Sequence, residues 1–274
     1  MDGRTKIISL KNLISYLILI LTFNVSSANE YQKGDVIILP LTESESQEDF
    51  FYKNSKITKI IKNDKKYLLF GIPYDINKGE NTLVLESNKA NKMIRFKIID
   101  KVFDIQHINF KQGKYQKKSK KDLERIISEK NKILEARRIK YDKFPDYNFI
   151  IPAEGIVTGV YGTRRYYNGI EGKYHNGHDI AADTGTSIVA ASSGKVILAG
   201  DFYYNGKFVM INHGNNLVSV YLHMHDIAVN TGDMVTKGQQ IGTIGNTGRS
   251  TGPHLHWSVI LNNSYINPLS LVRD

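Results

Sequence analysis

The sequence predicts a mainly β protein of 274 residues, organised as two β domains joined by a helix. We expect a C-terminal antiparallel β-sheet domain, a smaller N-terminal β-sandwich-like domain and a short basic helical connector between them. Short runs of β-branched and aromatic residues, bounded by Gly, Asn and Asp turns, recur in both halves. A helical period appears in one central segment. The chain has no cysteine, which excludes disulfides and thiolate metal sites.

Residues 1–28 have the features of a secretory signal. Three basic residues precede the mainly apolar run Leu13–Val25, and small residues precede a cleavage point after Ala28. The apolar run is shorter than the ~20 residues that cross a membrane. We therefore expect export to the periplasm or cell envelope, with no stable membrane span after cleavage; a retained N-terminal anchor is the alternative.

Residues 29–105 predict the N-terminal β domain. Breaks at Asn63-Asp64, Asn77–Gly79 and Asn88–Asn91 separate runs with the length and composition of strands. The spacing of these runs is typical of a sandwich. The expected strands are Val36–Leu41, Ile57–Ile61, Tyr67–Ile72, Thr82–Ser87 and Met93–Ile99.

Residues 106–148 form the predicted connector. Within it, Lys111–Lys143 holds 13 basic and 5 acidic residues, a net charge of +8. Ser119 and Asp122 have the spacing of a helix cap. An apolar stripe is expected to follow, made of Leu123, Ile126, Ile127 and Leu134. A solvated helix packed on one domain and an attraction to anionic envelope polymers both explain this segment; nucleic acid is not expected, since no aromatic-interleaved binding motif appears.

Residues 149–274 form the predicted C-terminal domain, and its clearest motif is GPHLHW at Gly252–Trp257. The apolar residues that follow predict a strand. Residues two apart on a strand face the same side, so His254 and His256 are expected to project together, roughly 7 Å apart at the backbone. One ring can bind a metal while the other stands beside it.

The segment YHNGHDIA supplies further metal-ligating groups. His175 and Asp179 would lie ~13 Å apart along a flat strand, so the chain must bend between them. Gly172 and Gly177 permit such a bend. With one histidine of the HxH pair they give two imidazoles and a carboxylate, a set that leaves a fourth zinc position for water. The chain has no HExxH helix.

Three motifs occur in a fixed order: HxGxD (His175–Asp179), YxH (Tyr221–His223) and GPHLHW (Gly252–Trp257). In this order and context, between about Pro152 and Leu271, the chain resembles the lysostaphin-type, or LytM-type, zinc endopeptidases. These enzymes cleave peptide bonds in peptidoglycan. The resemblance implies an exported zinc metalloendopeptidase acting on peptidoglycan cross-links, D-Ala-containing ones more than glycine bridges.

The resemblance also implies the roles of individual residues. It makes His175, Asp179 and His256 the ligands of one Zn²⁺ per chain, and His254 and His223 the non-ligand catalytic histidines. All five positions keep the family's residues, which favours an active enzyme. His254 is the expected general base, while His223 would stabilise the oxyanion or protonate the leaving amine.

Arg164, Arg165 and Tyr221 are the candidate substrate-binding residues. The two arginines resemble a sequence at the edge of the family's cleft, where Tyr161 replaces the usual Phe. Solvation of a loop or a structural salt bridge would explain them equally well. Tyr221 shares a strand face with His223 and with His225, and periodicity alone does not choose between these histidines.

Three further histidines carry no predicted role in catalysis. His178 alternates away from the HxGxD ligands, His213 is expected to be structural, and His107 is expected on the surface. Two other functional classes fit parts of the chain. A wall-binding or hydrolase-activating module would not need the complete ligand set. An acyl or phosphohistidine carrier would use the hairpin around Lys237, but would need no carboxylate ligand.

Overall fold

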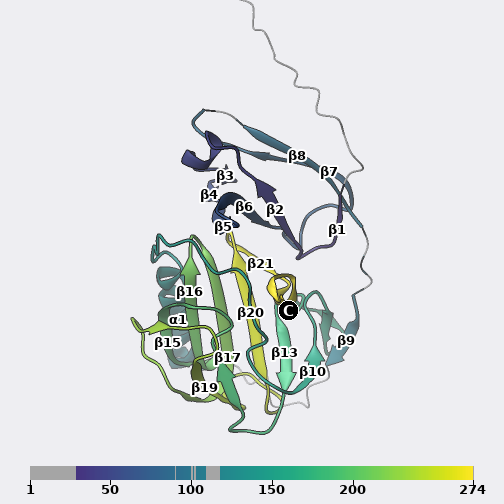
Figure 1. Cartoon of the computed structure of the whole chain (residues 1–274). Helices are drawn as coiled ribbons and strands as arrows, with labels where there is room; N and C mark the ends of the chain where they lie inside the picture. The colour runs from purple at the N-terminus through teal and green to yellow at the C-terminus, as the bar shows by residue number, and fades with distance from the viewer. Residues whose placement is uncertain (1–28, 90, 100, 102, 109–117, 274) are drawn as a thin grey trace, which may run out of the picture.

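The computed structural model describes residues 29–273 except 90, 100, 102 and 109–117. The predicted secretory signal lies outside the described residues. The prediction of a mainly β protein is confirmed: strands make up most of the regular structure, and the described part of the chain contains one α-helix (Figure 1). No helix in this part is long and apolar enough to cross a membrane.

The N-terminal β unit, β1 to β8, contains two small sheets with a shared core. Their strand orders are β1-β8-β7 and β2-β6-β5, and β3 pairs with β4. Side chains from both sheets, including Phe70 and Phe96, pack between them, so the sandwich-like prediction holds. The strands are β1 (Glu30–Tyr31), β2 (Val36–Pro40), β3 (Phe51–Tyr52), β4 (Ser55–Lys56), β5 (Thr58–Lys62), β6 (Lys65–Gly71), β7 (Gly79–Leu85) and β8 (Lys92–Ile98).

The predicted connector begins with a strand that the sequence analysis did not anticipate. This strand is β9 (Ile105–Ile108), and it pairs in parallel with β11 (Arg164–Tyr167), which in turn pairs with β12 (Ile170–Glu171). The exposed ring of His107 stacks on Tyr166, with 5.2 Å between ring centroids. The segment that leaves the N-terminal β unit therefore pairs with the strand that precedes the HxGxD motif.

The helix α1 (Lys120–Ala136) begins at the predicted cap. The Ser119 hydroxyl accepts from the Asp122 amide, and the Asp122 carboxylate accepts from the Ser119 amide, which satisfies two end groups of the helix. The helix packs on β15 through Arg125, which donates to the Asp201 carbonyl, and through Glu129, which accepts from the Tyr203 amide.

Most of the predicted apolar stripe of α1 is wrong as a packing face. Leu123, Ile127 and Leu134 are exposed. Ile126, the fourth residue of the stripe, is half-buried, and Ile133 and Ala136 contact the core of the large sheet. Side chains four residues apart lie on one helical face, and the docked face is fixed by the polar contacts of Arg125 and Glu129 as well as by apolar residues. Hydrophobic period alone did not identify the docked face.

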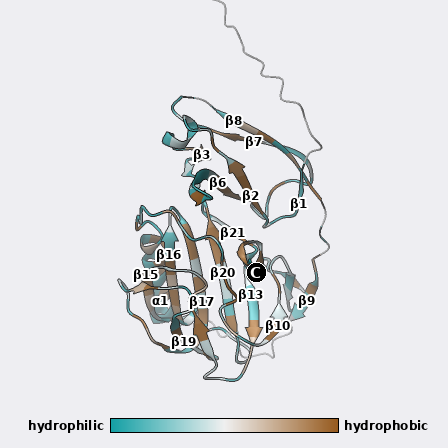
Figure 2. Ribbon diagram, in the orientation of Figure 1, coloured by the Kyte–Doolittle hydropathy of each residue, from teal (hydrophilic) through white to brown (hydrophobic). Residues whose placement is uncertain are grey.

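The C-terminal half forms one ten-stranded sheet. Its main path is β10-β13-β20-β17-β16-β15-β18, paired antiparallel throughout. The central strands are mainly hydrophobic (Figure 2), and cores cover both faces of the sheet. The strands are β10 (Ile156–Gly159), β13 (His178–Ala181), β14 (Ser187–Val189), β15 (Gly194–Phe202), β16 (Gly206–Gly214), β17 (Leu217–Ile227), β18 (Met234–Val235), β19 (Gln240–Ile244), β20 (Leu255–Leu261) and β21 (Ser264–Ile266).

The N-terminal β unit packs directly on the C-terminal half. Ile60 and Leu69 belong to the same buried cluster as the central strands of the large sheet. Tyr74 stacks on Tyr174 with 3.7 Å between ring centroids and an interplanar angle of 9°. Because Tyr174 directly precedes His175, this contact holds the chain just before the HxGxD motif.

Candidate metal centre

The three predicted ligands meet where β13 and β20 run side by side. Asp179 of β13 and His256 of β20 are register partners, and His175 lies just before β13. Oδ1 of Asp179 is 3.0 Å from Nε2 of His175 and 2.7 Å from Nδ1 of His256. These two ring nitrogens are 3.0 Å apart. Residues 81 positions apart in sequence therefore present their donor atoms to one point.

Glycines allow this close approach. A Cβ at Gly177 would lie 2.5 Å from the Trp257 carbonyl oxygen and 2.8 Å from the His256 ring. A Cβ at Gly159 would lie 2.5 Å from Oδ2 of Asp179. Side chains at these positions would push β13 away from its neighbours. The bend predicted between His175 and Asp179 is present, with Gly177 at its tightest contact.

Both ligand histidines are anchored through the ring nitrogen that faces away from the centre. Nδ1 of His175 donates to the Val160 carbonyl at 2.9 Å, and Nε2 of His256 hydrogen-bonds the Ser258 hydroxyl at 2.7 Å. The Val160 carbonyl can only accept, so Nδ1 of His175 carries N–H and Nε2 of the neutral ring keeps its lone pair. The Ser258 hydroxyl can donate or accept, and it allows the matching tautomer of His256. In these tautomers both lone pairs face Asp179, and a proton on either of these nitrogens would be donated to the carboxylate.

His223 and His254 complete the cluster and are anchored in the same way. Nδ1 of His223 donates to the Thr247 carbonyl at 2.8 Å, and Nδ1 of His254 donates to the Gly252 carbonyl at 2.9 Å. Their ring centroids are 4.9 Å apart, and Nε2 of His254 is 4.0 Å from Oδ1 of Asp179. The cluster thus brings together all five residues that the sequence analysis singled out.

The backbone at His223 explains why this histidine, and not His225, reaches the cluster. His223 has φ of 65°, in the left-handed region that non-glycine residues rarely adopt. Strain of this kind persists where the surrounding structure enforces it, and it concentrates at functional sites. His223 is buried, whereas the His225 side chain is 54% exposed beside Asp226. The alternative that periodicity left open is resolved in favour of His223.

Electrostatics put Asp179 and His256 in the protonation states that a metal requires. Burial alone would raise the pKa of Asp179, but hydrogen bonds with His175 and His256 hold it well below its ordinary value. Burial lowers the pKa of His256. At neutral pH the carboxylate is therefore charged and the His256 ring is neutral, as metal binding needs. Burial also lowers the pKa of His223, which stands beside the candidate ligands, to about 4.

The donor set fits a metal ion. Bonds of about 2.0–2.1 Å in a tetrahedron would place neighbouring donor atoms ~3.3 Å apart. The three donor atoms of His175, Asp179 and His256 are 2.7–3.0 Å apart and all three residues are buried. Two neutral imidazoles and one carboxylate leave room for a fourth, non-protein ligand.

Comparisons with known proteins agree with this site. The model of peptidase family M23 matches residues 173–268, which hold all five clustered residues. The C-terminal part of the chain belongs to peptidase family M23. A crystal structure from Pseudomonas aeruginosa, assigned to peptidase M23, superposes with a TM-score of 0.70 at 29% identity, covering 87% of this chain and 93% of that one. The M23 domain and the N-terminal β unit therefore recur together in a solved structure.

Named relatives match the M23 domain alone. The peptidoglycan DD-endopeptidases ShyA and ShyC of Vibrio cholerae are 42% identical over 95 residues and 45% identical over 96. The DD-carboxypeptidase/endopeptidase Mpg of Neisseria meningitidis is 38% identical over 99 residues. Each match covers 35–36% of this chain and only 22–23% of the relative. The chain thus matches about a fifth of the length of these relatives.

The prediction that Tyr221 contacts substrate is wrong for this structure. Tyr221 is fully buried in the core of the M23 domain. Its hydroxyl accepts from the Ala191 amide at 2.9 Å and hydrogen-bonds the Ser219 hydroxyl at 3.0 Å. Tyr221 and His223 are two apart, but the left-handed backbone at His223 breaks the regular alternation of the strand.

The two adjacent arginines of β11 lie in different environments. Arg164 is exposed and pairs with Glu171. Arg165 is partly buried and donates to Oδ2 of Asp179 at 3.0 Å. The salt-bridge alternative is thus present for both residues, and for Arg165 the partner is a member of the metal centre. Tyr161, which replaces the usual Phe, is buried and donates its hydroxyl to the Tyr265 carbonyl.

The remaining candidates lie outside the centre. His178 is buried on the alternate face of β13, as predicted, and burial lowers its pKa. His213 is enclosed by hydrogen bonds to the Ser193 carbonyl and the Ser219 hydroxyl. Lys237 pairs with Asp146 at 2.8 Å and donates to the Asn148 carbonyl, so its ammonium group serves a structural contact.

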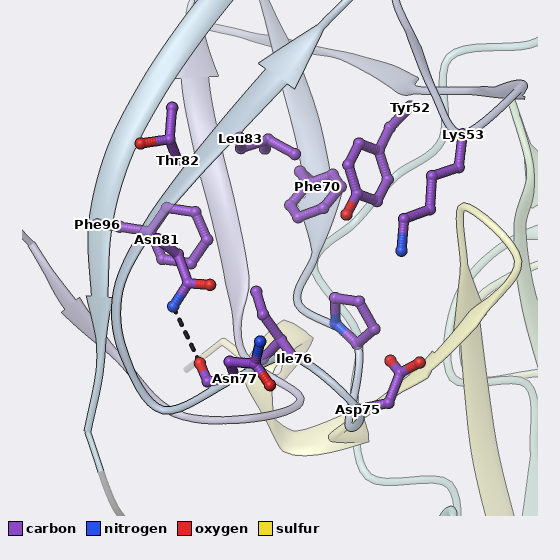
Figure 3. A pocket seen from close by; sticks show the side chains of 11 residues that line it. Tyr52, Lys53, Phe70, Asp75, Ile76, Asn77, Asn81, Thr82, Leu83 and Phe96 are labelled. Carbon is purple, nitrogen blue, oxygen red and sulfur yellow. Dashed lines mark hydrogen bonds between the residues drawn. The ribbon is translucent and has the colours of Figure 1, made fainter.

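A hollow in the N-terminal β unit is separate from the M23 domain (Figure 3). Aromatic rings of Tyr52, Phe70 and Phe96 form part of its lining, together with polar side chains of Asp75 and Asn81. None of the predicted site residues lines this hollow. The histidine cluster therefore remains the candidate functional site.

Proposed function

We propose that this protein is a zinc-dependent endopeptidase that hydrolyses peptide cross-links in peptidoglycan. One observation carries the proposal: three buried donor groups converge on one point, with two further histidines anchored beside them. The names of the Vibrio and Neisseria relatives support peptidoglycan as the substrate. A module that only binds the cell wall or activates another hydrolase would need neither the complete donor set nor its anchors.

Zn²⁺ would be held by Nε2 of His175, Oδ1 of Asp179 and Nδ1 of His256. A zinc ion in such a site acidifies a water molecule and polarises the carbonyl group of a peptide bond. Imidazole and carboxylate ligands without thiolates are compatible with Zn²⁺. The Val160 carbonyl keeps His175 in the tautomer that this role requires, and the Ser258 hydroxyl can accept from Nε2 of His256 in the matching tautomer.

His254 and His223 would handle protons during hydrolysis. Because each ring donates Nδ1–H to a carbonyl, each presents Nε2 as a proton acceptor in its neutral form. His254 would take the proton of the attacking water at Nε2. His254 then carries Nε2–H and can return that proton to the leaving amine. His223 would stabilise the oxyanion or protonate the amine after its own Nε2 has received that proton from His254 or directly from the water.

The names of the relatives and the N-terminal sequence support the proposed substrate bond and place of action. The DD-endopeptidase names favour D-Ala-containing cross-links. Export is expected from residues 1–28, and peptidoglycan lies outside the cytoplasm. The basic connector would attract anionic envelope polymers. Arg164 is exposed beside the M23 domain and is available to a substrate carboxylate; replacing it would then raise KM.

Digestion of purified cross-linked peptidoglycan tests the proposal. The chain is incubated with the polymer with and without a chelator, and the released fragments are identified by mass. We expect cross-linked dimers to disappear, the loss to stop with chelator, and activity to return with Zn²⁺. His256→Ala is the matched inactive control. A folded chain that binds Zn²⁺ but leaves dimers intact would instead support the activating or binding module.

A further inference from the structure

The two oxygens of Asp179 have different partners. Oδ1 faces the free nitrogens of His175 and His256 at 3.0 and 2.7 Å. Oδ2 instead accepts a hydrogen bond from the Arg165 guanidinium at 3.0 Å, in an ion pair whose side chains are 21% and 9% exposed. One oxygen is thus presented to the metal centre, while the other is held by a fixed positive charge.

The side of Asp179 that Arg165 holds faces Gly159 of β10. A Cβ placed on Gly159 would lie 2.5 Å from Oδ2. The glycine therefore leaves Oδ2 the space in which it meets the Arg165 guanidinium. A carboxylate can bind a metal through one oxygen or through both, and here the surroundings favour one.

Arg165 is itself held by the strand β9. Its Nε donates to Oε1 of Gln106 at 3.2 Å, and the two residues are register partners in the parallel pairing of β9 with β11. The stacking of His107 on Tyr166 adds a side-chain contact next to this pair. The strand that leaves the N-terminal β unit therefore orients the guanidinium that orients Asp179.

The neighbouring arginine provides an internal comparison. Successive residues of a strand point to opposite faces, and Arg164 pairs with Glu171 and hydrogen-bonds the Tyr166 hydroxyl at the surface. Arg164 shares charge, size and strand with Arg165 but has no contact with Asp179 among its hydrogen bonds and ion pairs in the described structure. The contact with the carboxylate is specific to the inward position.

We propose that Arg165, held by Gln106 of β9, is a positioning residue that makes Asp179 bind the metal through Oδ1 alone. This inference rests on the proposed function, because it needs a metal at His175, Asp179 and His256. It assigns to β9 a role in the metal centre: the strand sets the coordination of an ion that it does not touch. Loss of the Gln106–Arg165–Asp179 chain would let the carboxylate rotate and offer both oxygens.

Cobalt(II) binding to the full chain tests this inference. Co²⁺ replaces Zn²⁺ in sites of this type, and its visible spectrum is more intense in four-coordinate than in five-coordinate geometry. In Arg165→Met we expect one Co²⁺ still to bind, with a weaker and shifted visible band and an affinity about 10- to 100-fold lower. The Co²⁺ spectrum and affinity of Arg165→Lys should lie between those of Arg165→Met and those of the original chain. An ammonium group restores the positive charge but not the planar arrangement of donors of a guanidinium.

Two further variants keep the test decisive. Gln106→Leu leaves Arg165 in place and should give a smaller change in the same direction. Arg164→Met is the matched control and should leave the Co²⁺ spectrum and affinity unchanged. Thermal melting of the metal-free variants checks folding; if Arg165→Met does not fold, Gln106→Leu and Arg165→Lys decide in the same way.

The outcomes separate this inference from the proposed function. An original chain that binds neither Co²⁺ nor Zn²⁺ would overturn both. Normal Co²⁺ binding by the original chain, with an identical spectrum and affinity in folded Arg165→Met, would overturn the role of Arg165 and leave the metal centre standing. A raised KM with an unchanged Co²⁺ spectrum would make Arg165 a substrate contact and would also overturn the inference.

Discussion

Two buried sites in the same sheet contain histidine, and they differ in the partners of the ring nitrogens. At one, His213 hydrogen-bonds the Ser193 carbonyl at 2.9 Å and the Ser219 hydroxyl at 2.7 Å, so both ring nitrogens have partners within the protein. At the other, His256 also hydrogen-bonds a serine hydroxyl at 2.7 Å, that of Ser258. Its second nitrogen, however, faces Asp179 and another histidine.

The difference shows what distinguishes a structural cluster from a binding site. Burial and polarity are shared, and burial lowers the pKa of His213 to about 4 and that of His256 as well. In the His213 cluster each hydrogen bond ends on another protein group, as buried polar atoms require. In the metal centre, nitrogen lone pairs and a carboxylate oxygen face one another, and acceptors in such contact need a cation between them.

Removal of a ligand should have the largest effect. His256→Ala and Asp179→Ala each take one of three donor groups from the centre, so we expect loss of stoichiometric Zn²⁺ and at least a ~10³-fold loss of turnover. Metal analysis of the purified protein and peptidoglycan digestion measure both. His213→Gln is the control, and its folded fraction should retain Zn²⁺. Retention of Zn²⁺ by both ligand variants would show that the centre is assigned wrongly.

The anchored histidines beside the ligands should separate binding from turnover. His254→Ala and His223→Ala remove proton-accepting rings but no ligand, so we expect retained Zn²⁺ and a turnover lower by roughly 10²- to 10⁴-fold. Metal content and digestion rate are measured on the same preparations. If these variants lost Zn²⁺ as completely as His256→Ala, the division into ligands and proton acceptors would not hold.

The His213 cluster should instead affect the stability of the fold at acid pH. Since the pKa of His213 is about 4 when folded and ~6.5 when unfolded, the unfolded chain binds a proton that the native ring does not, and stability falls as pH drops from 6.5 to 4. His213→Gln should reduce this fall by up to about 3 kcal/mol. At pH 7 the same variant should be less stable, by about 1–3 kcal/mol, through lost hydrogen bonds.

Urea unfolding of the metal-free chain at pH 7, 5.5 and 4 measures this effect. The control is His225→Gln, because the His225 side chain is 54% exposed and its replacement should leave the pH dependence unchanged. An unaltered slope in His213→Gln would mean that the acid sensitivity arises at other histidines.

The two serines offer the smallest and most direct comparison. Ser258→Ala removes the anchor of a ligand and should weaken Zn²⁺ binding by about 10- to 100-fold. Ser219→Ala removes the hydroxyl that hydrogen-bonds His213. This variant should lose about 1–3 kcal/mol of stability without a change in Zn²⁺ affinity. Competition titration measures the Zn²⁺ affinity of both variants, and urea unfolding measures the stability of both. Equal effects of the two variants on Zn²⁺ affinity would remove the distinction between the clusters.

Much of the fold followed from local patterns. The five expected strands of the N-terminal β unit correspond to β2, β5, β6, β7 and β8, and their ends differ by at most three residues. The cap of α1 at Ser119 and Asp122 is also local, because it joins residues three apart. Patterns of this kind depend on neighbours in sequence, so the sequence contains the information that specifies them.

The strand β9 and the docked face of α1 could not be read in the same way. Gln106 and Arg165 are 59 residues apart, and β9 forms because β11 offers it a free edge. Leu123 and Ile127 have a helical period, yet they are exposed, and the helix docks through Ile133 and Ala136 together with Arg125 and Glu129. In each case the partner segment is remote in sequence, so it cannot be predicted from the residues of the strand or helix alone.

The sequence by itself determined which residues are the candidates for the chemistry: His175, Asp179, His256 and the two histidines beside them stand in ordered motifs whose residue types fit a metal centre. Only the tertiary structure decided which nitrogen of each ring faces inward, that His223 and not His225 joins the cluster, that Tyr221 is buried and that Arg165 holds Asp179. Residue type sets the chemistry that is possible. The orientation of each side chain depends on hydrogen bonds and packing between distant segments, and these exist only after the chain has folded.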